Sequence, residues 1–474
     1  MGASFLASEI ILATDAMPAA VPVESFSGVS TDTRCIAPGD LFVALEGERF
    51  DGHSFIQQAA EAGAAGAIVR RGVRVSAPEG FSVFEVEDTL AALGGLARLH
   101  RSRFTFPVGA VTGSNGKTTT KEMIRSILAV RGPFLATEGN LNNEIGVPKT
   151  LFGLRPGLKA AIVEMGMNHP GEIARLVSYA DPTCAAITCV GAAHLEGLKN
   201  VRAVAEAKGE IFRGLRQDGL MVVNLDDARV AAQARKCDRR MLTFGQAPEA
   251  DVRLASVSTL ERGAVAVVIH FDGRDWPVEL NFIGTHNARN ACCAFAMGIA
   301  LGASPEECVQ GLSQAKGWEH RLSVSPLPFG GAVIDDCYNA NPASMAAGLQ
   351  TLVSLASSRK SSPVAAVLGD MLELGAAETE SHRALGRQAA AQGVELLVTV
   401  GPRSVETWRE FIAAAPNRRA IAIPSPDDLS EAETFLRATL GGSSLLLVKG
   451  SRGMKLERLV EALIGIGAKG AGDP

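Results

Sequence analysis

The residues best suited to chemistry occupy positions 112–120, which read T-G-S-N-G-K-T-T-T between an apolar strand and a helical pattern. Small residues let a backbone curl so that its N–H groups converge on phosphate oxygens, and the helix N-terminus adds partial positive charge. We expect Lys117 to reach nucleotide phosphates and the Thr118 hydroxyl to bind Mg²⁺. A tight turn with an incidental lysine is the weaker alternative. The predicted phosphate-loop residues are Gly113, Ser114, Asn115, Gly116, Lys117, Thr118 and Thr119.

Two further candidates follow neighbouring apolar strands. Glu164 stands in A-A-I-V-E-M-G (160–166), and His194 stands in V-G-A-A-H-L-E-G (190–197). Ligands of open α/β sheets collect at the carboxyl ends of strands, where a carboxylate can hold Mg²⁺. A lone histidine after a strand is more often structural. Its topological place beside Glu164 and the phosphate loop favours a metal-binding role.

These residues need a scaffold, and apolar strand-like runs alternate with helical patterns along most of the chain. That alternation is typical of βαβ units and parallel sheets. We predict an α/β protein of three domains. They are a small N-terminal α/β domain (1–86), a central P-loop mononucleotide-binding domain with a mostly parallel sheet (87–322) and a C-terminal Rossmann-like domain (323–474).

Strands are predicted from apolar runs bounded by turn residues. The serine-rich stretch 354–362 is predicted to be a loop inside the last domain. A helix is expected from Ser54 and another over 89–100. The expected strands are 40–47, one ending at Val69, 108–112, 160–165, 184–190, 219–225, 332–335, 364–368, 396–400 and 444–448.

Composition restricts the class of protein. The chain has 474 residues, with 46 Lys+Arg against 51 Asp+Glu and a formal net charge of −5. This balance excludes long-range disorder and provides no basic footprint for nucleic acid. The first 33 residues lack Lys and Arg, and no apolar run approaches the ~18 residues of a membrane span. Eight cysteines form no C-x-x-C pair, which predicts reduced thiols. We expect a cytoplasmic protein with no membrane insertion.

The shortened loop G-x-x-G-K-T-T resembles that of the Mur ligase and folylpolyglutamate synthetase superfamily, whose members join an amine to a carboxylate using ATP. Further strings are similar to Mur ligase motifs, and the similarity spans about residues 28–455 in the family's order. It is closest to the branch that adds D-alanyl-D-alanine. The strings are E-M-G-M-N-H-P-G-E-I (164–173), H-N-A-R-N (286–290), W-E-H-R-L (318–322), D-D-C-Y-N-A-N-P (335–342), G-D-M-L-E-L-G (369–375) and V-K-G-S-R-G-M (448–454).

The resemblance implies a set of ATP contacts. Asn287 and Asn290 match residues near the adenine, while Arg321 and Asp336 match residues near the phosphates and the hinge. Without the family, the asparagine pair would be a helix cap. His320 stands where a glycine is common, so a different local turn is expected. Closure of the third domain is expected to assemble the site.

Lys208 in A-E-A-K-G-E-I-F matches a family lysine that is often carbamylated, which would make it an anionic bridge for a second Mg²⁺. An ordinary helix-surface lysine is the alternative. The implied catalytic residues are Lys117, Glu164, His194 and Lys208. The implied metal ligands are Thr118, Glu164, His194 and Lys208.

The resemblance also implies the substrates UDP-N-acetylmuramoyl-tripeptide and D-alanyl-D-alanine, joined through an acyl phosphate by a monomeric enzyme. The strings S-T-D-T-R (30–34) and F-D-G-H (50–53) resemble the uridine-nucleotide site, and N-L-N-N (140–143) resembles a substrate-facing loop. Such short strings also serve as turns. The implied substrate-binding residues are Thr33, Arg34, His53, Asn142, Asn143, Tyr338, Asn339, Lys449 and Arg452.

Three other functional assignments are considered beside a D-alanyl-D-alanine-adding Mur ligase. Folylpolyglutamate synthetase usually has its loop nearer the N-terminus, whereas 112 residues precede Gly113 here. The diaminopimelate-adding branch usually carries a D-N-P-R string, which this sequence lacks. The third reading is a nucleotide-binding regulator or a UDP-sugar scaffold without catalysis. The candidates Glu164, His194 and Lys208 favour an enzyme, because a nucleotide holder has less need of several metal ligands.

Overall fold

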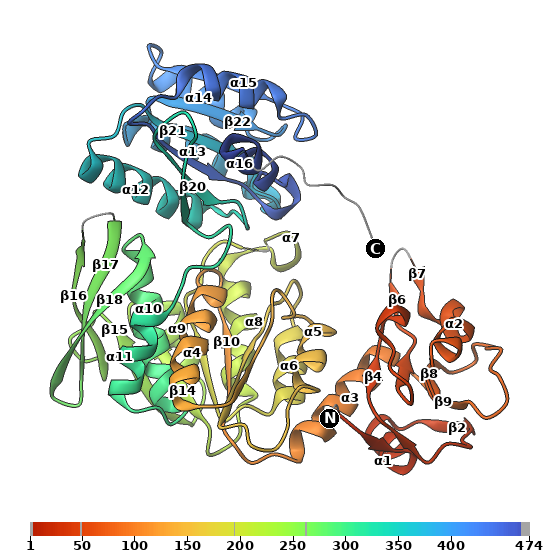
Figure 1. The fold of residues 1–474 in the computed structure, drawn as a ribbon. Helices are drawn as coiled ribbons and strands as arrows, with labels where there is room; N and C mark the ends of the chain where they lie inside the picture. Colours follow the sequence, from red (N-terminus) through yellow and green to blue (C-terminus); the bar gives the residue numbers. More distant parts are fainter. Residues whose placement is uncertain (1–2, 48–49, 194, 261–262, 466–474) are drawn as a thin grey trace.

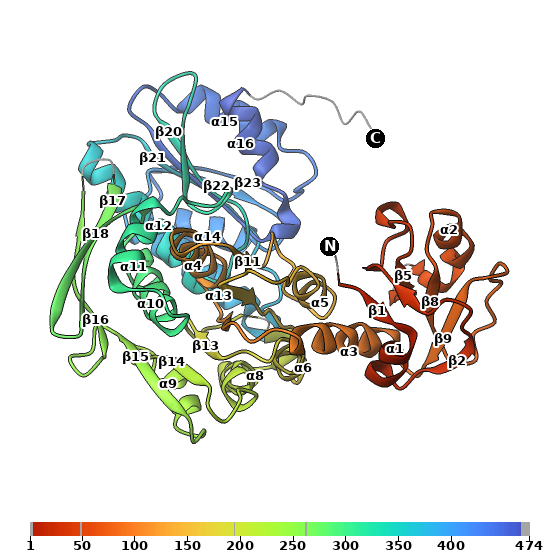
Figure 2. The ribbon, with the colours of Figure 1, turned by 60° about the horizontal axis from the view of Figure 1, so that its bottom comes forward.

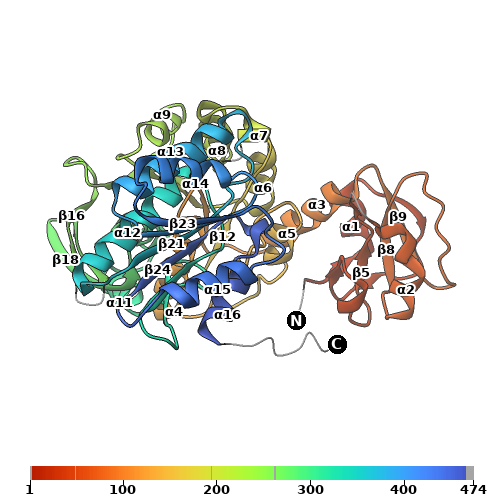
Figure 3. The same ribbon diagram turned by 90° about the horizontal axis from the view of Figure 1, so that it is seen from above.

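The computed structural model describes residues 3–47, 50–193, 195–260 and 263–465. These residues form three α/β units in chain order (Figure 1). The N-terminal unit lies to one side, and the central and C-terminal units are stacked on each other, as the view from above also shows (Figure 3). The predicted fold class is confirmed. No described helix has the length and apolar character needed to cross a membrane.

The N-terminal unit is built on a sheet in the order β2-β9-β8-β5-β4, parallel except for the β2–β9 pair. Its described strands are β1 (Phe5–Leu6), β2 (Met17–Ala20), β3 (Ser25–Phe26), β4 (Val29–Ser30), β5 (Leu41–Val43), β6 (Glu46–Gly47), β7 (Phe50–Asp51), β8 (Gly66–Arg70) and β9 (Ser82–Val86). Its helices are α1 (Ala7–Thr14), η1 (Thr33–Cys35), η2 (Gly52–Phe55) and α2 (Ile56–Glu61).

The central unit has a sheet in the order β11-β12-β10-β13-β14-β15-β16-β17-β18. It is parallel from β11 to β16 and antiparallel beyond. Strand β10 is buried along its whole length, as expected for a strand covered on both faces. The strands are β10 (Val108–Thr112), β11 (Phe134–Ala136), β12 (Ala160–Glu164), β13 (Cys184–Ile187), β14 (Leu220–Asn224), β15 (Arg240–Gly245), β16 (Val252–Thr259), β17 (Ala264–Phe271) and β18 (Arg274–Ile283).

Helices cover both faces of the parallel part of this sheet (Figure 2). Their positions follow local signals: Asp88 and Asn200, for example, cap α3 and α8 with their side chains. The helices are α3 (Thr89–Ser102), α4 (Lys117–Arg131), α5 (Gly146–Leu151), α6 (Glu172–Ala180), α7 (Leu195–Leu198), α8 (Val201–Arg213), α9 (Ala228–Ala234), α10 (His286–Ala300) and α11 (Pro305–Gln314).

The C-terminal unit has a sheet in the order β19-β20-β24-β21-β22-β23, parallel except for the β19–β20 pair. Its strands are β19 (Ser323–Pro326), β20 (Ala332–Asp336), β21 (Val364–Gly369), β22 (Leu396–Val400), β23 (Arg419–Ile423) and β24 (Leu445–Lys449). Its helices are α12 (Pro342–Arg359), η4 (Gly375–Ala377), α13 (Glu378–Ala391), α14 (Val405–Ala414), α15 (Ser430–Thr439), η5 (Arg452–Met454) and α16 (Glu457–Ile464).

Helix α3 joins the first two units. Leu93 and Leu96 belong to the N-terminal core, whereas Ala97 belongs to the central one. A Cβ on Gly94 would lie 2.2 Å from the Tyr179 ring, so the missing side chain permits close packing of α6. No sheet of the described chain crosses residues 86/87 or 322/323. We propose these two positions as the domain boundaries.

One sequence prediction is wrong. The serine-rich stretch 354–362 is not a loop, because α12 continues to Arg359. Leu349, Leu352, Leu355 and Ala356 recur at helical spacing and are buried in the C-terminal core. Burial of this face outweighs the weak helix propensity of serine.

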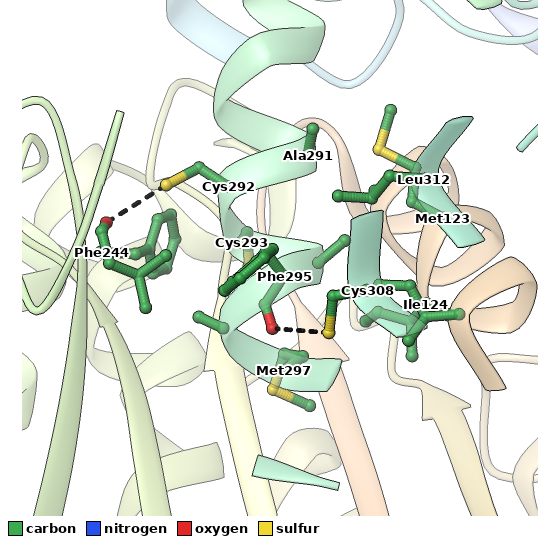
Figure 4. Close-up of a cluster of buried hydrophobic side chains, with 14 of the residues drawn as sticks. Met123, Ile124, Phe244, Ala291, Cys292, Cys293, Phe295, Met297, Cys308 and Leu312 are labelled. Atoms are coloured by element: carbon green, nitrogen blue, oxygen red, sulfur yellow. Dashed lines mark hydrogen bonds between the residues drawn. The ribbon is translucent and has the colours of Figure 1, made fainter. Parts of the chain in front are cut away.

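The central core predicts a measurable stability effect. Phe295 of α10 is fully buried (Figure 4). Its ring packs edge-on against that of Phe271, with the ring centroids 5.7 Å apart. Phe295→Ala should lower the free energy of unfolding by about 3–5 kcal/mol, because apolar contacts are lost and a cavity remains. Chemical denaturation measures the change. Leu12→Ala, at a side chain that is 80% exposed, is the control and should change it by less than about 0.5 kcal/mol.

Candidate active site

The predicted phosphate loop lies between β10 and α4 and needs its glycines. Gly113 has a φ of 153° and Gly116 a φ of 79°. A Cβ on Gly113 would lie 1.8 Å from Thr188 Oγ1, and a Cβ on Gly116 would lie 2.3 Å from Asn290 Oδ1. Both the backbone conformation and the lack of space therefore select glycine. The loop is also tied to the end of β13, since the Ser114 N–H donates to the Cys189 carbonyl at 2.9 Å.

Lys117 is the cation of this loop. Its ammonium donates to the Gly113 carbonyl at 2.7 Å, which folds the side chain back over the loop. Burial lowers the pKa of Lys117, and the positive charge of Arg321 lowers it further, while Glu164 opposes the shift. Lys117 is half-buried, and a cation in such a place without enough negative charge nearby favours binding of an anion such as phosphate.

Glu164 ends β12, the strand next to β10, and only 1% of it is exposed. Its Oε1 accepts hydrogen bonds from Thr118 Oγ1 at 3.1 Å and from Asn142 Nδ2 at 2.9 Å. Its Oε2 is buried without a hydrogen-bond partner among the described residues. A buried carboxylate oxygen beside a hydroxyl is a donor set that suits Mg²⁺. Thr118 and Glu164 therefore fit the predicted metal site.

Lys208 lies on α8 with only 1% of its surface exposed, so it is not a helix-surface lysine. Burial holds the pKa of Lys208 well below its usual value, and the charge of Lys117 lowers it further. Lys208 therefore faces the interior, close enough to Lys117 for their charges to interact. The fourth predicted metal ligand, His194, lies outside the described residues.

The segment before β19 brings Arg321 to the phosphate loop. Arg321 Nη2 donates to Thr118 Oγ1 at 3.0 Å, and its guanidinium lies 3.9 Å from the centre of the Tyr338 ring. His320 has a φ of 60°, a conformation that glycine adopts freely, and its ring contacts Asp335 at 2.7 Å. The turn therefore keeps a glycine-like backbone despite the histidine.

Two asparagines of α10 lie next to the loop. Asn290 Nδ2 donates to Asn287 Oδ1 at 2.9 Å, and Asn287 Nδ2 donates to the Ile283 carbonyl at 2.8 Å. Neither residue is the N-cap of α10, which is Thr285. The capping alternative is therefore wrong. Asn290 instead lies against Gly116.

In the C-terminal unit, Asp336 and Lys449 form a buried ion pair at 2.7 Å. Lys449 also donates to the Asn339 carbonyl at 2.9 Å, so its ammonium is engaged inside the unit. Arg452 is an exposed residue that pairs with Glu457 at 3.1 Å.

Other predicted substrate-binding residues lie away from the loop or have local partners. In the N-terminal unit, Arg34 pairs with Asp32 and holds the pKa of that carboxyl at about 2. His53 is buried, with Nδ1 2.6 Å from Asp51 Oδ1 and Nε2 accepting from the Arg70 N–H at 2.8 Å. Thr33 lies on η1 beside Arg34.

The asparagine-rich loop divides into two roles. Asn142 contacts Glu164, whereas Asn143 Oδ1 accepts the backbone N–H groups of Ile145 and Gly146 at the start of α5. Asn142 is thus brought to the predicted metal site. Asn143 serves the local turn.

Sequence reasoning missed two residues that this geometry singles out. Thr137 Oγ1 accepts the Glu164 backbone N–H at 3.0 Å. Asn341 contacts Asn115 of the phosphate loop through both side-chain amides. Asn341 precedes Pro342 and a helical pattern, a spacing typical of an N-cap, but nothing in it indicates a partner 226 positions away.

Comparisons with known proteins agree along most of the chain. Residues 25–101 match the family described as Mur ligase family, catalytic domain; residues 111–298 match Mur ligase middle domain; and residues 320–452 match Mur ligase, glutamate ligase domain. The UDP-N-acetylmuramoyl-tripeptide–D-alanyl-D-alanine ligase of Bacillus subtilis (strain 168) is 37% identical over 92% of this chain and 93% of its own. The ligase of the same name from Escherichia coli (strain K12) is 37% identical over 93% and 94%.

Solved structures agree with the sequence relatives. A crystal structure of MurF from Acinetobacter baumannii covers 98% of this chain and 99% of its own, with a TM-score of 0.88 and 33% identity. A structure of MurF from Thermotoga maritima in complex with ADP covers 92% and 97%, with a TM-score of 0.79 and 27% identity. Since relatives more than 30% identical extend over nine-tenths of both sequences, this chain belongs to the Mur ligase family.

Proposed function

We propose that this protein is an ATP-dependent ligase that adds D-alanyl-D-alanine to UDP-N-acetylmuramoyl-tripeptide. The products are the UDP-linked pentapeptide precursor of peptidoglycan, ADP and phosphate. The observation that carries this proposal is the similarity, over nine-tenths of both chains, to ligases of that name. The phosphate loop supports the use of ATP, since it leads into Lys117 and Thr118, and Thr118 is hydrogen-bonded to Glu164 at the end of β12.

The reaction requires that the carboxylate first be activated. A carboxylate cannot form an amide at neutral pH until it has a leaving group, which transfer of the γ-phosphoryl group supplies. Lys117 and Arg321 offset negative charge on the transferring phosphoryl, and the loop backbone orients it. Thr118 and Glu164 are suited to hold Mg²⁺, which would polarise the phosphate oxygens when bound. The amine then displaces phosphate through a tetrahedral intermediate, without an enzyme nucleophile.

The remaining substrate contacts belong to this proposal. We assign Asn287 and Asn290 to the adenine end of ATP from the family resemblance. The contact of Asn290 with Gly116 puts this hydrogen-bonded pair near the nucleotide loop. Arg34 is exposed and Thr33 is half-buried on η1 of the N-terminal unit, and we assign the UDP group to this region from the family resemblance. His53 would act by supporting that region, since both of its ring nitrogens have internal partners.

Lys208 is proposed to be carbamylated and to bridge a second Mg²⁺. Only a neutral amine attacks CO₂, and burial, which lowers the pKa of Lys208 well below its usual value, increases the share of the neutral form. We predict that removing CO₂ from the assay lowers turnover severalfold and that added bicarbonate restores it. A ¹³C carbamate resonance from labelled CO₂ should be present in the wild type and absent in Lys208→Met. Equal turnover in both conditions, with no carbamate signal, would contradict the modification.

The function is tested by phosphate release from Mg-ATP, UDP-N-acetylmuramoyl-tripeptide and D-alanyl-D-alanine, with each component omitted in turn. Release that requires all three, with a UDP-linked pentapeptide found by mass spectrometry, supports the proposal. Release with a different amine or acid would keep the family and exclude these substrates. Size-exclusion chromatography with light scattering tests the accompanying inference of a monomer, and cell fractionation tests a cytoplasmic location.

A further inference from the structure

A side-chain contact between two units has no role in the chemistry described above. Asn341 Nδ2 donates to Asn115 Oδ1 at 2.8 Å, and Asn115 Nδ2 donates to Asn341 Oδ1 at 3.3 Å. The two amides thus form a reciprocal pair. Asn115 belongs to the phosphate loop of the central unit, and Asn341 belongs to the C-terminal unit.

Each partner is fixed within its own unit. The Asn115 carbonyl accepts from Thr188 Oγ1 at 2.5 Å, which ties the loop to the end of β13. Asn341 is the N-cap of α12, and its Oδ1 also accepts the Ser344 N–H at 2.9 Å. A displacement of either unit would therefore move one amide away from the other.

Helix α12 transmits such a displacement because it is not a mobile flap. Met345, Leu349 and Leu352 are fully buried in one core with Leu368 of β21 and Leu447 of β24. The N-terminus of α12 therefore moves with the C-terminal sheet. Only 9% of Asn341 is exposed, so water competes poorly for its amide.

We propose that Asn115 and Asn341 form a latch that holds the C-terminal unit against the phosphate loop. Asn341 is then a positioning residue: it acts through Asn115 on the loop that carries Lys117. The latch keeps the loop aligned while Arg321 reaches Thr118 from the adjoining segment. Its catalytic consequence rests on the proposed ligase function, whereas its existence does not.

Asn341 both bonds Asn115 and caps α12, so the test must remove the first role and keep the second. Asn341→Ser keeps an N-cap side chain of similar quality but removes the amide. Asn200→Ser is the matched control, because Asn200 caps α8 through the Ala203 N–H at 3.0 Å and is exposed. The primary measurement is hydrogen exchange, read by mass spectrometry, in peptides covering 113–120. We expect Asn341→Ser to raise exchange there about tenfold, as loss of two neutral hydrogen bonds allows, and Asn200→Ser to leave it unchanged. Unchanged exchange in Asn341→Ser would overturn the proposal.

Turnover provides a second measurement in the same variants. Asn341→Ser should lower kcat about tenfold in the wild type and cause no further loss when it is introduced into Asn115→Ser, because the contact is then already absent. Additive losses would overturn the latch while leaving the ligase function intact. If the wild type shows no turnover with the proposed substrates, the proposed function fails, and hydrogen exchange still decides whether the latch exists.

Discussion

Lys117→Met should lower kcat by about 10³-fold and leave the protein folded. The ammonium is the loop's own cation, and charge stabilisation of a transferring phosphoryl group contributes effects of about this size. The melting temperature should stay near that of the wild type or rise, because burial already lowers the pKa of Lys117 and methionine fills similar space without a charge. Phosphate release and thermal unfolding measure the two effects.

A second variant shows whether the loss of turnover is specific to Lys117 or follows from replacing any lysine. Lys159 is exposed and directly precedes β12, at the end of the strand opposite Glu164. Lys159→Met should retain wild-type turnover. If Lys117→Met kept more than about a tenth of wild-type kcat, the loop would be a structural turn, and the assignment of Lys117 to phosphoryl transfer would be wrong.

The parts of the site that lie close in sequence could be predicted. The strand 108–112, the loop and the helix after it carry local signals: a continuous apolar run, two glycines and a helical period. The carboxyl ends of β10 and β12 meet because parallel neighbours align them, which is why Glu164 could be placed near Thr118. These relations follow from chain geometry alone.

Relations between distant segments could not be predicted. The antiparallel extension β16–β18 adds to the same sheet, yet its alternating pattern does not indicate which edge it joins. The sequence does not indicate that the Nε2 atom of His53 has a partner, because Arg70 contributes only a backbone N–H to that hydrogen bond. Likewise, the sequence around Asn341 indicates only an N-cap, and its contact with Asn115 exists only when the C-terminal unit packs on the phosphate loop. Tertiary packing decides each of these contacts.

Glu164→Gln should lower kcat/KM by about 10²- to 10³-fold, since it removes the carboxylate that suits Mg²⁺. The protein should not be destabilised, because the buried Oε2 has no hydrogen-bond partner among the described residues and the change removes a buried charge. Higher Mg²⁺ concentrations should restore part of the activity. Glu138→Gln, at an exposed position shortly before Asn142 in the sequence, is the control and should behave as the wild type.

The same variant should also change the dependence of activity on pH. Glu164 raises the pKa of Lys117 against the larger effect of burial, so removing its charge lowers that pKa further. A lysine with a lower pKa loses its proton, and its charge, at lower pH. The alkaline limb of the kcat/KM profile, where Lys117 becomes neutral, should therefore move to lower pH in Glu164→Gln. A limb that stays in place or moves to higher pH would show that Lys117 and Glu164 are not electrostatically coupled in the working enzyme.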